Sequence, residues 1–174
     1  MTSDNPTITT LQLILRPFKR TDVIPLHRIL NQPNILQYYP NPAPPDLERV
    51  ERIIERQLTH WAKHGYGWWA VIPNGGTELI GWNGLQYLPE TDEVEVGYLL
   101  SQPFWRHGFA TEGAQASLQF GFDNFKFGEI IGLTHPNNTA SQNVLKKCGM
   151  RFTGEARYFD MQVHRFTLQT HANA

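Results

Sequence analysis

Residues 93–100 alternate apolar and polar side chains, the pattern of a β-strand with two different faces. Val94, Val96, Tyr98 and Leu100 share one face, and the two glutamates of this segment share the other. We expect the first face to be buried in a core. Further strands are predicted, from short apolar runs that end at turn residues, at 11–15, 68–72, 79–88, 129–134, 150–153 and 163–169.

Other segments repeat apolar residues at three- and four-residue steps, as one face of an α-helix does. The first such segment covers residues 21–30. The longest begins after Asp46, a residue type that caps helix N-termini, and ends at Gly65. Another helix is predicted to open near Ala110, and Asn138 is expected to cap a short fourth helix.

The order of these segments is β-α-α-β-β-β-α-β-α-β-β. Strands with helices inserted between them predict an α/β (α+β) fold, in which helices cover both faces of a mixed sheet. We expect six to seven strands. No linker, repeat or low-complexity tract divides the chain, so we predict a single domain over residues 8–170.

Composition narrows the function. The chain has 174 residues, a formal net charge of −1 at pH 7 and 18% charged residues, which argues against a nucleic-acid partner held by a basic face. No apolar run reaches the roughly 18 residues of a membrane span, and residues 1–10 lack a signal-peptide pattern. The only cysteine, Cys148, excludes an internal disulfide. We expect a cytoplasmic enzyme or ligand-binding domain without a membrane partner, a monomer or homodimer.

The loop before the third helix has the features of an anion site. A helix N-terminus carries unpaired N–H groups and the positive end of the helix dipole. Gly108 lets the backbone approach a phosphate closely, small Ala110 leaves the entrance open, and Arg106 adds a charged donor. The loop therefore predicts a pyrophosphate ligand. The motifs of nucleoside triphosphate and dinucleotide sites are missing from the chain.

Four segments together resemble the GNAT acetyltransferase superfamily. They are residues 95–100 (EVGYLL), 105–112 (WRHGFATE), 138–141 (NTAS) and 146–150 (KKCGM). Within that superfamily the chain is similar to the branch of ribosomal-protein N-terminal acetyltransferases (RimJ/RimL-like), which the opening LILRP of residues 13–17 also resembles. The resemblance spans about residues 11–168. It implies the GNAT acyl-CoA N-acyltransferase fold, with acetyl-CoA bound across a splayed pair of parallel strands.

The resemblance also implies which residues bind acetyl-CoA. The pantetheine arm is expected on backbone groups of Tyr98, Leu99 and Leu100. The pyrophosphate is expected in the loop formed by Arg106, His107, Gly108, Phe109, Ala110 and Thr111. Asn138 and Ser141 are expected near the thioester. One departure is Trp105, which stands where the superfamily's loop often has glutamine or arginine. We expect the loop to bind phosphate nonetheless, because backbone N–H groups do most of that binding.

The chemistry of acetyl transfer requires a base, because an amine is mostly protonated at neutral pH and an ammonium ion has no lone pair. Glu95 is our candidate base, since it lies nearer the expected thioester than Glu93 on the same face. A salt-bridged or substrate-binding carboxylate is the alternative for Glu95. Ser141 is the candidate donor to the leaving thiolate, or an ordinary first-turn serine, with Tyr158 as a weaker alternative acid.

Two functions remain open from the sequence. The first is an N-acetyltransferase that passes the acetyl group of acetyl-CoA to a primary amine by direct attack in a ternary complex. The amine could belong to a protein N-terminus, an amino acid or a small molecule. The second is a non-catalytic acyl-CoA-binding module. We predict no metal: His60 and His64 are four residues apart on a helix, but the glutamate of a zinc motif is missing, and we expect both to be exposed.

Overall fold

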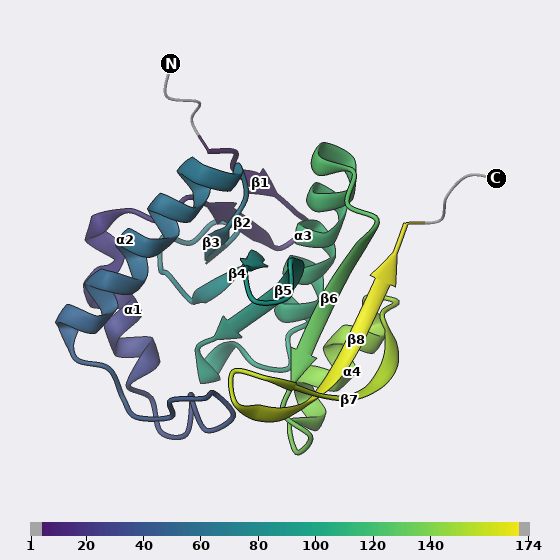
Figure 1. Cartoon of the computed structure of the whole chain (residues 1–174). Helices are drawn as coiled ribbons and strands as arrows, with labels where there is room; N and C mark the ends of the chain where they lie inside the picture. The colour runs from purple at the N-terminus through teal and green to yellow at the C-terminus, as the bar shows by residue number, and fades with distance from the viewer. Residues whose placement is uncertain (1–4, 171–174) are drawn as a thin grey trace.

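The computed structural model describes residues 5–170, which form one eight-stranded sheet with helices on both faces (Figure 1). The strands are β1 (Ile8–Thr9), β2 (Leu13–Arg16), β3 (Trp68–Pro73), β4 (Gly81–Leu88), β5 (Glu93–Leu100), β6 (Glu129–Thr134), β7 (Arg151–Tyr158) and β8 (Met161–Gln169). Their order across the sheet is β1-β2-β3-β4-β5-β6-β8-β7. The predicted number of six to seven strands was wrong, because β1, only two residues long, pairs with β2.

The helices begin and end close to the predicted positions. They are α1 (Val23–Leu30), α2 (Leu47–His64), α3 (Phe109–Phe125) and α4 (Thr139–Lys147), with short 3-10 helices η1 (Arg20–Asp22) and η2 (Gln102–Phe104). Asp46 caps α2 by accepting the Arg49 N–H at 2.8 Å, and Gly65 ends it with φ 74°. These caps satisfy backbone groups that the helix itself leaves unpaired.

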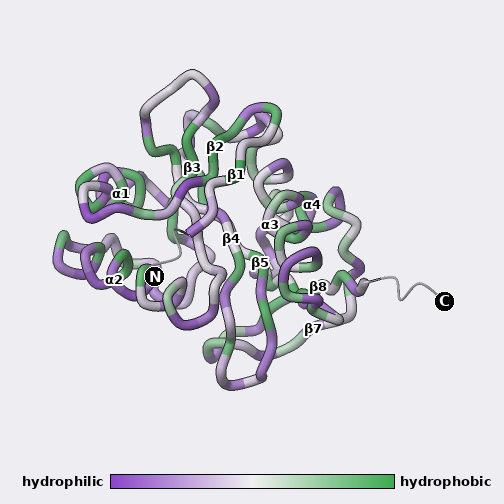
Figure 2. Tube along the Cα trace, turned by 90° about the horizontal axis from the view of Figure 1, so that it is seen from above, coloured by the Kyte–Doolittle hydropathy of each residue, from purple (hydrophilic) through white to green (hydrophobic). Residues whose placement is uncertain are grey.

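The sheet separates two hydrophobic cores. Figure 2 shows α1 and α2 on one side of the middle strands and α3 and α4 on the other. The alternation along β5 is confirmed: Val94, Val96 and Leu100 pack in the core that contains α3 and α4, whereas Leu99 packs in the core beneath α1 and α2. Each face of β5 is therefore fixed by burial, since a one-residue slip would exchange the faces.

The sheet splays where its parallel strands meet. β5 and β6 are the parallel pair, and they meet at a single register position, Glu95 with Ile131. β6 continues with β8 through a six-pair antiparallel ladder, and β7 forms the edge beyond it. Past Glu95, β5 runs toward α3 without pairing to β6. The part of β5 after Glu95, which does not pair with β6, carries the site described below.

Two sequence expectations need correction here. The strand predicted at residues 150–153 covers Arg151–Tyr158, so Tyr158 lies at the end of β7.

His60 is not exposed. Its ring Nδ1 lies 2.8 Å from the Tyr66 carbonyl oxygen, and its Nε2 accepts the Tyr87 N–H at 3.1 Å. The imidazole therefore bridges the backbone just before β3 and the backbone of β4, in place of a direct hydrogen bond between the two.

These contacts make stability depend on pH. His60 must stay neutral to accept from Tyr87, and burial lowers the pKa of His60 below its ordinary 6.5. As pH falls below about 6.5 the unfolded chain takes up the proton first, so the folded state loses stability. We expect the free energy of unfolding to decline there by at most about 1.4 kcal/mol per pH unit, the limit for one proton. Urea denaturation at pH 5–8 measures this.

His60→Gln is the matched variant for that measurement. Glutamine also has a donor group, its NH₂, and an acceptor, its carbonyl oxygen, but it does not titrate. The variant should show a flatter decline of stability with falling pH than the parent. Identical slopes in the two proteins would show that His60 is not the group responsible.

Candidate active site

The turn that leads into α3 is lined with unpartnered backbone amides. Among the described residues 5–170, no hydrogen bond takes up the N–H groups of residues 106–111. Arg106 and Gly108 both have left-handed backbones, with φ values of 65° and 81°. Residues 106–108 are exposed, and a Cβ built on Gly108 would meet nothing within 4 Å. Successive amides in such a turn form a concave anion site, which the N-terminus of α3 reinforces.

Side chains hold this turn from outside. The Trp105 indole N–H donates to the Leu100 carbonyl at 2.6 Å, and the His107 ring Nδ1 lies 2.8 Å from the Trp105 carbonyl. The His107 ring stacks on Phe109 with ring centroids 5.5 Å apart. The tryptophan that departs from the family pattern therefore ties the turn to the end of β5 and leaves the amides free.

Glu112, in the first turn of α3, was not among the sequence-predicted functional residues. Its carboxylate accepts hydrogen bonds from the Thr10 hydroxyl and from the backbone and side chain of Gln12, at 2.5–2.7 Å. These bonds tie the β1–β2 hairpin to the start of the helix that carries the amide turn. The signal in the sequence was an acidic residue in a helix first turn, which the helix dipole favours. Its partners are about a hundred positions away in the chain and could not be inferred.

Glu95 lies on β5 at the point where the sheet splays. Burial, followed by the negative charge of Glu93, raises the pKa of Glu95 to about 8. Within residues 5–170, no hydrogen bond compensates the burial of this carboxyl group. A carboxyl with a pKa near the working pH is suited to accept and release protons.

Glu93, two residues earlier on the same face, has a different environment. It accepts hydrogen bonds from the Tyr158 hydroxyl at 2.6 Å and from Arg165 at 2.7 Å, and Arg165 also binds Glu129 at 2.7 Å. Partial burial favours the neutral carboxyl, but these bonds outweigh it and lower the pKa of Glu93. The two carboxylates of β5 are therefore separated in pKa, the arrangement in which acid and base roles can be divided.

The N-terminus of α4 approaches β5 on the face that carries Tyr98, opposite the face that carries Glu93 and Glu95. Asn138 caps α4, and its side-chain oxygen accepts the Ser141 N–H at 3.1 Å. The Tyr98 hydroxyl lies 3.0 Å from both the carbonyl oxygen and Oγ of Ser141. Burial raises the pKa of Tyr98 well above its usual range. The sequence suggested only backbone contacts for Tyr98, so its side-chain contact with Ser141 was missed.

Comparison with known proteins identifies the family of the chain. A family model described as an acetyltransferase (GNAT) domain matches residues 12–151. The chain belongs to the GNAT acetyltransferase family. YoaA, an uncharacterized N-acetyltransferase of Bacillus subtilis strain 168, is 27% identical over 162 residues, which cover 90% of this chain and 89% of YoaA.

Two solved structures show the same GNAT fold. An acetyltransferase from Agrobacterium tumefaciens C58 superposes with a TM-score of 0.84 at 24% identity, covering 95% of each chain. RimL, a ribosomal L7/L12 α-N-protein acetyltransferase in complex with coenzyme A, superposes with a TM-score of 0.81 at 17% identity, covering 97% of this chain and 100% of RimL. GNAT acetyltransferases use acetyl-CoA, so this GNAT domain is an acyl-transfer enzyme.

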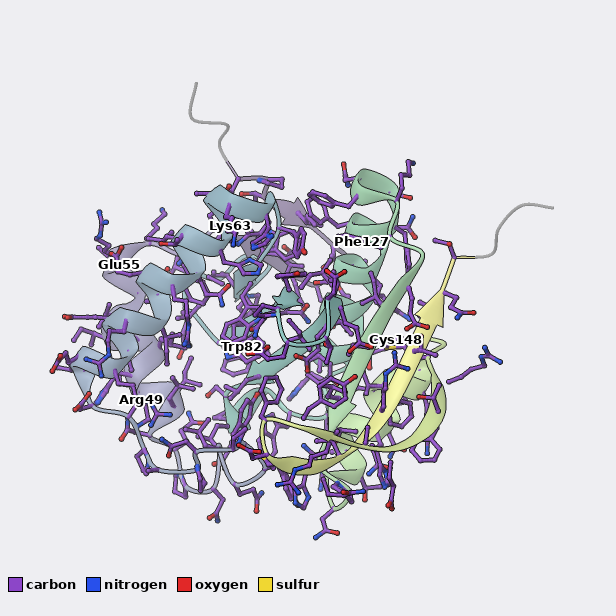
Figure 3. All side chains as sticks on the ribbon, in the orientation of Figure 1. Arg49, Glu55, Lys63, Trp82, Phe127 and Cys148 are labelled. Atoms are coloured by element: carbon purple, nitrogen blue, oxygen red, sulfur yellow. The ribbon has the colours of Figure 1, made fainter. Side chains whose placement is uncertain are left out.

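The loop between α1 and α2 reaches the site of this GNAT domain. Tyr39 donates a hydrogen bond to the Tyr98 carbonyl at 3.4 Å, and its buried hydroxyl feels the charge of Glu95. Tyr38 stacks on His135, which follows β6, with ring centroids 5.2 Å apart. Trp68 stacks on Trp82 with ring centroids 3.7 Å apart, beneath α1 and α2 (Trp82 is labelled in Figure 3).

Cys148 and Tyr158 each have a polar contact within the described residues. The Cys148 thiol, at the end of α4 (Figure 3), lies 3.7 Å from the Thr111 carbonyl, and burial raises its pKa to about 11. It is therefore too weakly acidic to serve as a nucleophile. Tyr158 is held by Glu93. Within residues 5–170, no group of three metal-ligating side chains comes together, and no helix is long and apolar enough to cross a membrane.

Proposed function

We propose that this GNAT enzyme transfers the acetyl group of acetyl-CoA to a primary amine by direct attack in a ternary complex. The observation that carries this proposal is the position of Glu95. A half-buried carboxyl with a pKa of about 8 lies where the parallel strands part, on the strand that leads to the amide turn. A cofactor-binding module needs the turn but has no need of such a carboxyl.

Acetyl-CoA is proposed to lie along the open edge of β5. The six free amides of residues 106–111 and the Arg106 side chain suit a pyrophosphate. Beyond Glu95, β5 does not pair with β6. We propose that the amides of pantetheine bind backbone groups of Tyr98, Leu99 and Leu100 there, where the Tyr98 and Leu100 carbonyls now accept from the side chains of Tyr39 and Trp105. Asn138 and Ser141, at the start of α4, then lie near the thioester.

In the proposed reaction, Glu95 accepts a proton from the substrate ammonium. The freed nitrogen lone pair forms a bond to the thioester carbonyl carbon, and the bond from that carbon to sulfur breaks. The nitrogen loses a second proton, which ends on the leaving thiolate. Ser141 donates a hydrogen bond to that thiolate while negative charge develops on sulfur. Tyr38 and Tyr39 are proposed to line the acceptor side of the gap.

Membership of the GNAT family implies an amine acceptor, and we propose a more specific type from the resemblance to one branch. The RimJ/RimL-like branch remains our proposal, supported by the LILRP segment of residues 13–17 and by the shared fold of RimL. RimL is named as an α-N-protein acetyltransferase, whose acceptor is a protein N-terminus. We propose a protein N-terminus as the acceptor of this chain too.

Thiol release from acetyl-CoA tests the proposed function. The assay uses a panel of peptides with free N-termini, amino acids and polyamines, with N-acetylated peptides as matched controls. We expect release of coenzyme A with at least one free amine and none with the acetylated peptides. Tight acetyl-CoA binding without turnover on the whole panel would instead support an acyl-CoA-binding module.

A further inference from the structure

Two hydroxyl groups meet between β5 and α4. The Tyr98 hydroxyl, carried on the face of β5 that packs against α3 and α4, lies 3.0 Å from the carbonyl oxygen and from Oγ of Ser141. Ser141 stands in the first turn of α4, where its N–H already donates to the Asn138 side chain. Tyr98 therefore connects the strand expected to hold the pantetheine arm with the serine expected at the thioester.

The protons of this pair allow two arrangements with the same heavy-atom positions. A carbonyl oxygen only accepts, whereas each hydroxyl has one proton to donate. In the first arrangement Tyr98 donates to the Ser141 carbonyl and accepts the proton of Ser141 Oγ. In the second, Tyr98 donates to Oγ, and the Ser141 proton is free to point elsewhere.

The leaving thiolate selects between the two arrangements. A sulfur anion is a stronger acceptor than a neutral phenol oxygen, because hydrogen bonds to charged groups are stronger than those between neutral ones. As the bond between carbon and sulfur breaks, the Ser141 proton is drawn toward sulfur. Oγ then retains a partner only if Tyr98 turns its own proton from the carbonyl to Oγ. Two rotating hydroxyls accomplish this without movement of β5 or α4.

We propose that Tyr98 is a positioning residue that directs the Ser141 proton to the leaving thiolate. Ser141 donates a hydrogen bond and keeps its proton. The thiolate becomes a thiol with the second proton that the amine nitrogen loses, so no other reactant is required. This inference rests on the proposed function, because it assumes that coenzyme A sulfur lies at Ser141.

Tyr98 remains a donor over the whole working range, because burial raises its pKa. A group that loses its proton easily would become an acceptor and would compete with the thiolate for the Ser141 proton. The other groups close to Tyr98 are Tyr39, Glu95 and Cys148. None of these supplies a hydrogen bond to the Tyr98 hydroxyl, so within the described residues its contacts are with Ser141 alone.

The ionisation of bound coenzyme A tests the inference without any turnover. The thiolate of coenzyme A absorbs ultraviolet light at wavelengths shorter than the main aromatic bands of proteins, and subtracting the desulfo-coenzyme A complex removes the contribution of Cys148. Tyr98→Phe deletes only the hydroxyl. We expect it to raise the pKa of the bound thiol by about one unit, which corresponds to tenfold weaker stabilisation of the thiolate. Ser141→Ala should raise it at least as much.

The kinetic test uses the same variants. Tyr98→Phe should lower kcat about tenfold with little change in KM for acetyl-CoA, and Tyr98→Phe/Ser141→Ala should be no slower than Ser141→Ala alone, because the two hydroxyls act as a unit. Tyr87→Phe is the matched control. It removes a hydroxyl that binds Asp92 at 2.9 Å, outside the site, and should change neither quantity.

Two results would overturn the inference. One is an unchanged thiol pKa in Tyr98→Phe. The other is a double variant whose loss of kcat is the product of the losses in the two single variants, with a Tm lowered by Tyr98→Phe. That combination is the behaviour of a residue that acts only through packing. If no amine is acetylated, the proposed function fails, yet the thiol titration still decides the role of Tyr98.

Discussion

Gly108→Glu should weaken binding of coenzyme A at least 100-fold, a loss of about 2.7 kcal/mol. The new carboxylate would project from the turn whose amides, at residues 106–111, are free, and whose residues 106–108 are exposed. It would repel the pyrophosphate and compete for the same N–H groups. Isothermal titration calorimetry with coenzyme A measures the effect.

The fold should survive this change, because a side chain on Gly108 meets open space. The left-handed φ of 81° costs about 1–2 kcal/mol for a residue with a Cβ. Gly75→Glu is the matched control, since Gly75 has φ 77°, open surroundings and a place in the turn between β3 and β4. It should lower Tm similarly and leave coenzyme A binding unchanged. Unaltered affinity in Gly108→Glu would refute the assignment of the pyrophosphate site.

The features that could be predicted from sequence are local. Alternation along residues 93–100 predicted both faces of β5, because a strand repeats every two residues. Caps at Asp46 and Asn138 predicted where helices begin, because a cap acts within three residues. The amide turn was foreseen for the same reason: a glycine before a helix determines the local backbone.

The features that were missed depend on contacts between distant parts of the chain. Tyr98 is 43 positions from Ser141, and Arg165 is 72 positions from Glu93. No periodicity within an element shows which side chain of the next element it will meet. β1 was missed because its pairing with β2 stabilises two residues that have little strand pattern of their own. The same limit applied to His60, whose Nε2 accepts from Tyr87, 27 positions away in β4.

Glu95→Gln should lower kcat/KM at pH 8 by about 100-fold or more, the usual contribution of a general base, while coenzyme A affinity stays within threefold. The parent enzyme should gain activity as pH rises and level off above about 8, because Glu95 accepts a proton only after its carboxyl, with a pKa of about 8, has ionised. The variant should lack that rise. A pH–rate profile of the parent and of the variant, at saturating acetyl-CoA, measures the loss of activity and the missing rise.

Glu93→Gln is the matched control for this profile, with the same substitution on the same face two residues away. The negative charge of Glu93 contributes to the raised pKa of Glu95. Its removal should shift the rise in activity to lower pH and leave the plateau in place. If Glu95→Gln and Glu93→Gln gave the same profile, Glu95 would not be the base.

Stability provides an independent check on Glu95, because a base held in a poorly solvated site destabilises the fold. Its pKa is raised to about 8 in the folded state, against an ordinary 4.5. Between these values the unfolded carboxyl has lost its proton while the folded one retains it. The contribution of Glu95 to folding is therefore greatest below pH 4.5 and is lost as pH rises toward 8. Glu95→Gln removes this loss, so its Tm advantage over the parent should grow across that window. An advantage that is constant with pH would mean that Glu95 ionises normally and that a different group sets the pH–rate profile.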